Sequence, residues 1–166
     1  MQAHEDVAAA APAAGAAISC EGVSKTFRRG SAEVHALDRV DLEVRDGEFV
    51  AVLGPSGCGK STLMRLVAGL VPATTGRIAI AGTKVDGPHT GLGIVFQAAT
   101  LLDWRTVLGN VLLQLELRGL DPKSYEARAT ALLKAVGLGD FTGALPRELS
   151  GGMKQRAAIV RALVHD

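Results

Sequence analysis

The sequence predicts an α/β fold with a strand-rich first half and a helix-rich second half. Residues 18–50 alternate apolar and polar side chains in short runs separated by turn residues, which is typical of antiparallel strands. Residues 48–53 are an almost continuous apolar run, followed at once by the stretch GPSGCGKST. From residue 106 onward the apolar residues recur with helical spacing. The second pattern places a glycine-rich loop directly after a buried strand.

The expected elements follow from this patterning. Residues 48–53 should be a central strand buried on both faces, because its apolar residues do not alternate. Gly69 and Pro72 should end the helix that follows the loop. The expected strands are, in chain order, 18–23, 34–37, 40–44, 48–53, 77–81 and 92–96. The expected helices are 60–70, 106–119, 122–137 and 150 to about 164.

The expected organisation has three regions. Residues 1–17 are rich in Ala and Pro, lack a basic leader and should be a disordered tail. An antiparallel β-subdomain and the core that carries the loop should occupy 18–97. A helical subdomain should occupy 98–166, with residues 97–105 as the joint between the two halves.

Composition limits the partners that the chain can have. Hydrophobic residues make up 48% and charged residues 21%, as in globular proteins. Eighteen Lys and Arg offset 17 Asp and Glu, so no net field attracts nucleic acid, and we expect no nucleic-acid partner. Cys20 and Cys58 are too few for a disulfide scaffold and favour a reducing compartment. No stretch is long and apolar enough to span a bilayer, so we expect any membrane association to come through a partner.

Residues 54–62, called the glycine loop below, begin with a match to G-x-x-x-x-G-K-[ST], the P-loop that holds nucleotide phosphates. Gly57 and Gly59 let the backbone approach a ligand closely and point N–H groups inward. The helix that follows adds free N–H donors and the positive end of its dipole. The alternative is a glycine-rich turn beside a solvated lysine. The motif predicts a P-loop NTPase (RecA-like) core without deciding between GTPases, kinases and transport ATPases.

The side chains of the glycine loop suit a nucleotide with Mg²⁺. Lys60 offers a point charge to the outer phosphates, Ser61 a hydroxyl to Mg²⁺, and Thr62 a hydroxyl to an inner phosphate. The side chain of Cys58 is expected to be a spacer. The nucleotide-binding residues expected in the loop are Gly54, Pro55, Ser56, Gly57, Cys58, Gly59, Lys60, Ser61 and Thr62.

A second motif narrows the class. Residues 149–156, LSGGMKQR, resemble the LSGGQ signature of ABC ATPases, with Met153 where Gln is frequent. Ser150 can cap the helix that follows, and Gly151 and Gly152 expose backbone donors at its positive end. In that family the signature completes the ATP site of the opposite subunit in a head-to-tail dimer, so the resemblance implies that these three residues act in trans. A capped surface helix after a glycine turn is the alternative.

Three further residues fit this resemblance. Gln97 resembles the Q-loop glutamine that senses Mg²⁺ and the attacking water, although a solvated loop residue is an alternative. The resemblance would make Gln97 and Lys60 the catalytic residues and Ser61 and Gln97 the Mg²⁺ ligands. Phe27 resembles the aromatic residue that stacks on adenine, although core packing is an alternative. Trp104 falls where the family contacts its membrane subunit, although an interior anchor is an alternative. The stretch 97–111 and the Met variant look closest to the nitrate, sulfonate and taurine import group.

The resemblance covers residues 18–166 and implies the ATP-binding subunit of an importer, with ATP and Mg²⁺ as cofactors. Its implied partners are a second ATP-binding subunit in a homodimer, transmembrane permease subunits and, indirectly, an extracytoplasmic solute-binding protein. It would then lie on the cytoplasmic face of the membrane as a peripheral protein.

The chain ends at Asp166, where the family's Walker B strand should begin. We therefore expect an N-terminal portion of an ABC ATPase that lacks part of its core sheet, the Walker B Asp and the catalytic Glu, and that is inactive alone. A soluble non-transport ABC ATPase and a non-catalytic nucleotide-binding remnant are the alternatives.

Overall fold

The computed structural model describes residues 16–165, which divide into two compact units, one ending at His89 and one beginning at Thr90. This division falls before residue 97, where the sequence places the joint. Most of the expected tail, residues 1–15, lies outside the described residues. Ala16 and Ala17 belong to the first strand, so that strand begins two residues earlier than expected.

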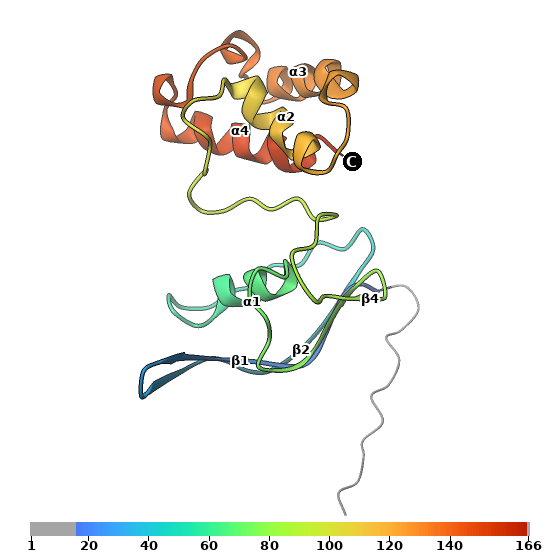
Figure 1. Ribbon diagram of the computed structural model, residues 1–166, viewed down its shortest axis with the longest axis vertical. Helices are drawn as coiled ribbons and strands as arrows, with labels where there is room; N and C mark the ends of the chain where they lie inside the picture. The colour runs from blue at the N-terminus through green and yellow to red at the C-terminus, as the bar shows by residue number, and fades with distance from the viewer. Residues whose placement is uncertain (1–15, 166) are drawn as a thin grey trace, which may run out of the picture. The chain divides into compact units, whose positions relative to one another are not determined.

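The first unit is built on a four-stranded antiparallel sheet with the order β2-β1-β3-β4 (Figure 1). Its strands are β1 (Ala16–Arg29), β2 (Ala32–Arg45), β3 (Thr75–Ile80) and β4 (Thr83–Lys84). The short strands expected at 18–23, 34–37 and 40–44 merge into the single hairpin β1–β2. Register shifts between Cys20 and Val23 and between Val23 and Lys25 absorb the breaks in the alternation, as β-bulges do.

Helix α1 (Lys60–Val67) covers the sheet and begins within the glycine loop. It buries Leu63, Leu66 and Val67 and contacts β2 and β3, where Ile78 and Ile80 are also buried. The helix is three residues shorter than the expected 60–70.

Gly69, with φ of 70°, follows α1 in the left-handed conformation common after helices. A Cβ at this position would collide with the backbone of Gly87, so packing also requires a glycine here.

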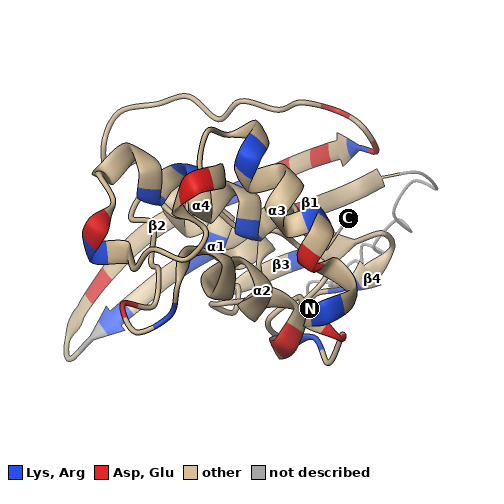
Figure 2. Ribbon diagram, turned by 90° about the horizontal axis from the view of Figure 1, so that it is seen from above, with Lys and Arg blue, Asp and Glu red and all other residues tan. Residues whose placement is uncertain are grey.

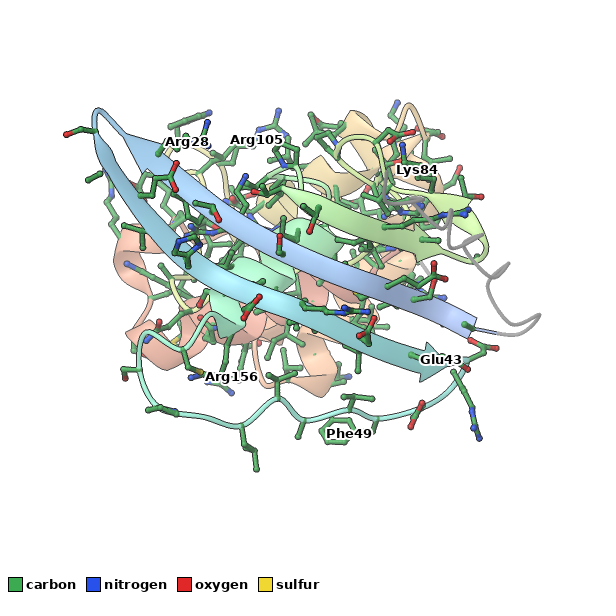
Figure 3. The ribbon with its side chains drawn as sticks, turned by 90° about the horizontal axis from the view of Figure 1, so that it is seen from below. Arg28, Glu43, Phe49, Lys84, Arg105 and Arg156 are labelled. Carbon is green, nitrogen blue, oxygen red and sulfur yellow. The ribbon has the colours of Figure 1, made fainter. Side chains whose placement is uncertain are left out.

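Two expected strands are not strands in the structure. Residues 48–53 and 92–96 run without regular secondary structure. Phe49 is 93% exposed and Leu53 is 89% exposed, and Figure 3 shows Phe49 on an extended segment outside the sheet. The prediction of a central strand buried on both faces is therefore wrong. A strand needs a neighbouring backbone to bind its N–H and C=O groups, and neither segment pairs with any of β1–β4.

The second unit is helical, as expected. Its elements are α2 (Val107–Leu117), η1 (Pro122–Tyr125), α3 (Glu126–Ala135), η2 (Gly139–Phe141), η3 (Pro146–Glu148) and α4 (Gly151–Leu163). Pro122 starts the 3₁₀ turn that leads into α3, where its missing N–H costs nothing. One apolar core joins α2, α3 and α4, and its fully buried members include Val107, Val111, Leu115, Leu133, Leu138 and Val164.

The surface carries mixed charge. Figure 2 shows basic and acidic residues interspersed along the elements, in keeping with the near-zero net charge.

Among residues 16–165, no helix has the length and apolar character needed to cross a membrane.

We expect the double substitution Phe49→Thr and Leu53→Thr to slow the self-association of this 166-residue chain. Both side chains are exposed on extended backbone, the kind of segment that pairs with another copy. Static light scattering at equal concentration measures the effect. The free energy of unfolding should change by less than about 0.5 kcal/mol, as for other surface substitutions.

The matched control is Val23→Thr, which places the same hydroxyl in a fully buried site and should lower stability instead. An unchanged aggregation rate in the double variant would contradict the role of this segment.

Candidate functional site

The backbone of the glycine loop adopts conformations that side chains disfavour. Gly54, Gly57 and Gly59 have φ of 155°, 83° and 97°. A Cβ on Gly59 would collide with the carbonyl oxygen of Ala36 and the side chain of Leu37, both on β2. Glycine at this position therefore lets the loop lie directly against the sheet, which fixes where α1 begins.

Lys60 turns back into the glycine loop. Its Nζ donates hydrogen bonds to the carbonyl oxygens of Gly54 and Pro55, both at 2.7 Å, and lies 3.5 Å from Cys58 Sγ. The ammonium group is thus already bound by two carbonyl oxygens of the loop. An oxygen of an anionic ligand can replace one of these acceptors without moving the charge out of the loop.

The start of α1 supplies further donors. Gly59 occupies the N-cap position and gives no side-chain cap, so the helix leaves first-turn N–H groups for another acceptor. The side chain of Ser61 is exposed, and that of Thr62 is half-buried. Backbone N–H groups, an ammonium and two hydroxyls at a positive helix end suit a phosphate chain. Of these groups, the Ser61 hydroxyl is the oxygen ligand that Mg²⁺ would take.

Phe27 lies near the end of β1 and is 40% exposed, which does not fit the core-packing alternative. The Nζ of Lys25 lies 5.0 Å from the centre of its ring, a cation–π distance. Lys25 Nζ also donates to the carbonyl oxygen of Pro72 at 2.7 Å, which holds it in place. The ring is therefore held by a cation while part of its surface stays open for a planar group.

The second motif forms the start of α4. Ser150 occupies the N-cap position and its Oγ accepts a hydrogen bond from the N–H of Met153 at 3.3 Å, as the sequence predicts. Gly151 and Gly152 are exposed, and a Cβ on either would meet nothing within 4 Å. Packing among the described residues therefore does not demand glycine here. The two glycines leave an open, positively polarised helix end.

Gln97 is exposed and follows the irregular segment 92–96. It belongs to the second unit with Ser150, whereas the glycine loop and Phe27 belong to the first. Each unit thus carries one part of the expected site.

Sequence reasoning missed Asn110, which organises the segment around Trp104. Its amide is fully buried and accepts a hydrogen bond from the N–H of Leu102 at 2.6 Å. It donates, each at 3.0 Å, to the carbonyl oxygens of Leu102, Arg105 and Thr106. The signal in the sequence is a lone amide inside the apolar helix VLGNVLL.

A surface ion pair holds the same segment. Arg105 Nη1 donates to both carboxylate oxygens of Glu116 on α2, at 2.7 and 2.9 Å; Figure 3 labels Arg105. This contact raises the pKa of Arg105 and lowers the pKa of Glu116. Trp104, between these anchors, is 77% exposed, so the interior-anchor alternative is wrong for the described chain.

Comparison with protein families gives a match to the family described as ABC transporter over residues 37–166. An uncharacterized ABC transporter ATP-binding protein of Methanocaldococcus jannaschii is 46% identical over 149 residues, which cover 90% of this chain and 56% of that protein. The taurine import ATP-binding protein of Rhizobium johnstonii is 50% identical over 130 residues, covering 78% and 50%. The nitrate import ATP-binding protein of a Synechocystis strain is 48% identical over 136 residues, covering 82% and 50%.

Solved structures give the same family. A dimeric bacterial ABC transporter cassette has a TM-score of 0.80 at 34% identity, covering 89% of this chain and 69% of that one. A post-hydrolysis state of the same cassette, bound to ADP and Pi, has a TM-score of 0.77 at 31% identity with the same coverage. The chain spans about half the length of the curated relatives it matches.

We expect Asn110→Leu to lower the free energy of unfolding by about 2–4 kcal/mol, because each buried polar group left unpaired costs about 1–3 kcal/mol. Chemical denaturation measures the loss, and proteolysis between residues 101 and 106 should become faster. Gln114→Leu, an amide substitution on the same helix, is the control and should change stability by less. Equal stability of Asn110→Leu and the parent protein would contradict the bracing role of Asn110.

Proposed function

This chain belongs to the ABC transporter family, and on that premise we propose that it is the ATP-binding part of an importer subunit. It binds Mg-ATP in the glycine loop and couples ATP hydrolysis to solute transport. The observation that carries this proposal is the Lys60 ammonium, held by the carbonyls of Gly54 and Pro55 at the open start of α1.

In this proposal the triphosphate lies along the glycine loop. Lys60 exchanges its loop carbonyls for outer phosphate oxygens, and the first N–H groups of α1 bind the inner ones. Ser61 would hold Mg²⁺, and the metal would supply positive charge next to the phosphate oxygens. Thr62 donates its hydroxyl to an inner phosphate, and the adenine stacks on the open surface of Phe27.

The second unit supplies the remaining contacts. Gln97 orients the metal and the attacking water. Ser150, Gly151 and Gly152 face the outer phosphate of the ATP that is bound to a second copy of the subunit. The open glycines at the start of α4 support this role, because a Cβ on either would meet nothing within 4 Å. A dimeric cassette of similar structure supports the dimerisation that this role needs.

The importer assignment draws support from relatives named as taurine and nitrate import proteins. A small anion of the nitrate, sulfonate or taurine kind is therefore the proposed solute, chosen by the permease and solute-binding subunits. Trp104, exposed on a braced segment, is the proposed contact with the permease. The subunit then works on the cytoplasmic face of the membrane as a peripheral protein.

We expect Lys60→Ala to weaken Mg-ATP binding by about 1.5–3 kcal/mol, the scale of hydrogen bonds to charged groups. Isothermal titration calorimetry measures the affinity, and turnover of the assembled transporter should be lost. Lys134→Ala removes the same charge from an exposed position on α3 and should leave ATP affinity unchanged. Normal ATPase activity in the Lys60 variant would contradict the proposal that the glycine loop binds ATP for hydrolysis.

We expect Ser150→Asp to abolish ATP-dependent dimerisation while leaving ATP affinity near normal. Asp keeps the N-cap of α4, so the helix should stay folded, but its carboxylate would face the phosphate of the partner site. Sedimentation velocity with and without ATP measures the dimer. Thr106→Asp makes the same change at the N-cap of α2 and should leave dimerisation intact. An equal loss of ATP affinity in the Ser150 variant would show that Ser150 serves its own chain.

A further inference from the structure

The segment that carries Gln97 is held by the signature helix α4. Residues 96–100 lie in neither a helix nor a strand, and the chain passes beside α4 before it enters α2 (Figure 1). Gln155 Nε2, on α4, donates to the carbonyl oxygen of Phe96 at 3.0 Å, directly before Gln97. Six residues further along α4, Arg161 binds the residues after Gln97.

Arg161 makes a forked contact with two consecutive residues. Its Nη1 donates to the carbonyl oxygen of Thr100 at 2.9 Å, and its Nη2 donates to the carbonyl oxygen of Ala99 at 3.2 Å. Nη2 also donates to Thr100 Oγ1 at 3.1 Å. The Arg161 side chain is half-buried, and this burial lowers the pKa of the guanidinium from its ordinary value. A planar guanidinium suits such a fork, and a lysine ammonium cannot reproduce its geometry.

Thr100 needs such a contact because its backbone is strained. Its φ is 45°, in the left-handed region that a β-branched residue rarely enters. Residues in such conformations persist when their surroundings fix them. Arg161 binds both the carbonyl and the hydroxyl of Thr100, which fixes this residue from two directions.

The segment is also held on the other side of Gln97. A Cβ on Gly93 would collide with the carbonyl group of Ala162, the residue next to Arg161. The backbone at 93 therefore lies directly against α4. Gln97 thus lies between two anchor points on one helix, Gly93 at Ala162 and Thr100 at Arg161.

We infer that Arg161 is a positioning residue, which holds Thr100 in its left-handed conformation and so fixes the course of the Gln97 segment relative to the signature helix. The functional consequence rests on the proposed function, in which Gln97 orients metal and water. Ser150 starts the helix whose last turns hold this segment. A shift of α4 on contact with a second subunit would therefore carry the Gln97 segment with it.

The test compares the assembled transporter with and without Arg161→Met, a substitution that keeps an unbranched apolar stem and removes the donors. Hydrogen exchange followed by mass spectrometry should show the amides of residues 97–101 exchanging about tenfold faster or more. The kcat for ATP should fall about tenfold or more, with KM changed by less than about threefold, because the contact does not include Lys60. Arg161→Lys should be intermediate, since it keeps the charge without the fork.

The control is Arg156→Met on the same helix. Arg156 Nη1 donates to the carbonyl oxygen of Val136 at 2.6 Å, away from the Gln97 segment, and Figure 3 labels this residue. This variant should lower the unfolding temperature without faster exchange at 97–101. Adding Thr100→Gly to Arg161→Met should restore part of the lost order and kcat, because glycine adopts the left-handed conformation without strain.

The outcomes separate this inference from the proposed function. If Lys60→Ala abolishes turnover but Arg161→Met leaves kcat and exchange at 97–101 unchanged, the positioning role is wrong and the function stands. If Arg161→Met only lowers the unfolding temperature, and Thr100→Gly rescues nothing, Arg161 is merely structural and the inference fails. If Lys60→Ala keeps full turnover, the function fails, and the exchange data alone decide whether Arg161 holds the segment.

Discussion

The close approach of Gly59 to β2 is the constraint on which the first unit depends. The loop backbone lies where no side chain fits, against the carbonyl of Ala36 and the side chain of Leu37. This contact sets the starting point of α1, and α1 in turn covers the sheet through Leu63 and Leu66. The same approach leaves Lys60 at the helix start, where its ammonium can reach the loop carbonyls. Packing and the candidate site therefore share one residue, and a larger residue at 59 would disturb both.

In the second unit, hydrogen bonds from side chains, and not a glycine that permits close approach, fix the local backbone. Ser150 accepts a hydrogen bond from the N–H of Met153 and so caps the start of α4, which remains exposed. Further along α4, Gln155 and Arg161 hold a segment that has no regular structure of its own. One helix thus carries an exposed motif at its start and supports Gln97 along its length. Local order in the irregular segment comes from α4 rather than from a ladder of backbone hydrogen bonds.

The sequence predicts the features that depend on local chemistry. The glycine loop, the Ser150 cap and the helices of the second unit could all be read from residue types and spacing. The strands at 48–53 and 92–96 could not, because apolar patterning reports what a segment would bury and says nothing of whether a neighbouring strand is present. The continuous hairpin β1–β2 was not predicted for a related reason. Its register shifts interrupt the alternation of apolar and polar residues, but the two strands stay paired. The roles of Asn110 and Arg161 depend on backbone groups that only the folded chain brings together.

The bracing of Trp104 has a mechanical consequence. The buried amide of Asn110 binds backbone groups at Leu102, Arg105 and Thr106. Arg105 also forms an ion pair with Glu116, which lies near the end of α2. The segment between these anchors is short and has little freedom to bend. A partner that docks on Trp104 would meet a surface that is already ordered, so docking would cost little conformational entropy. A displacement of the Trp104 side chain by such a partner would then move α2 with it, because the segment that joins them cannot change its conformation freely.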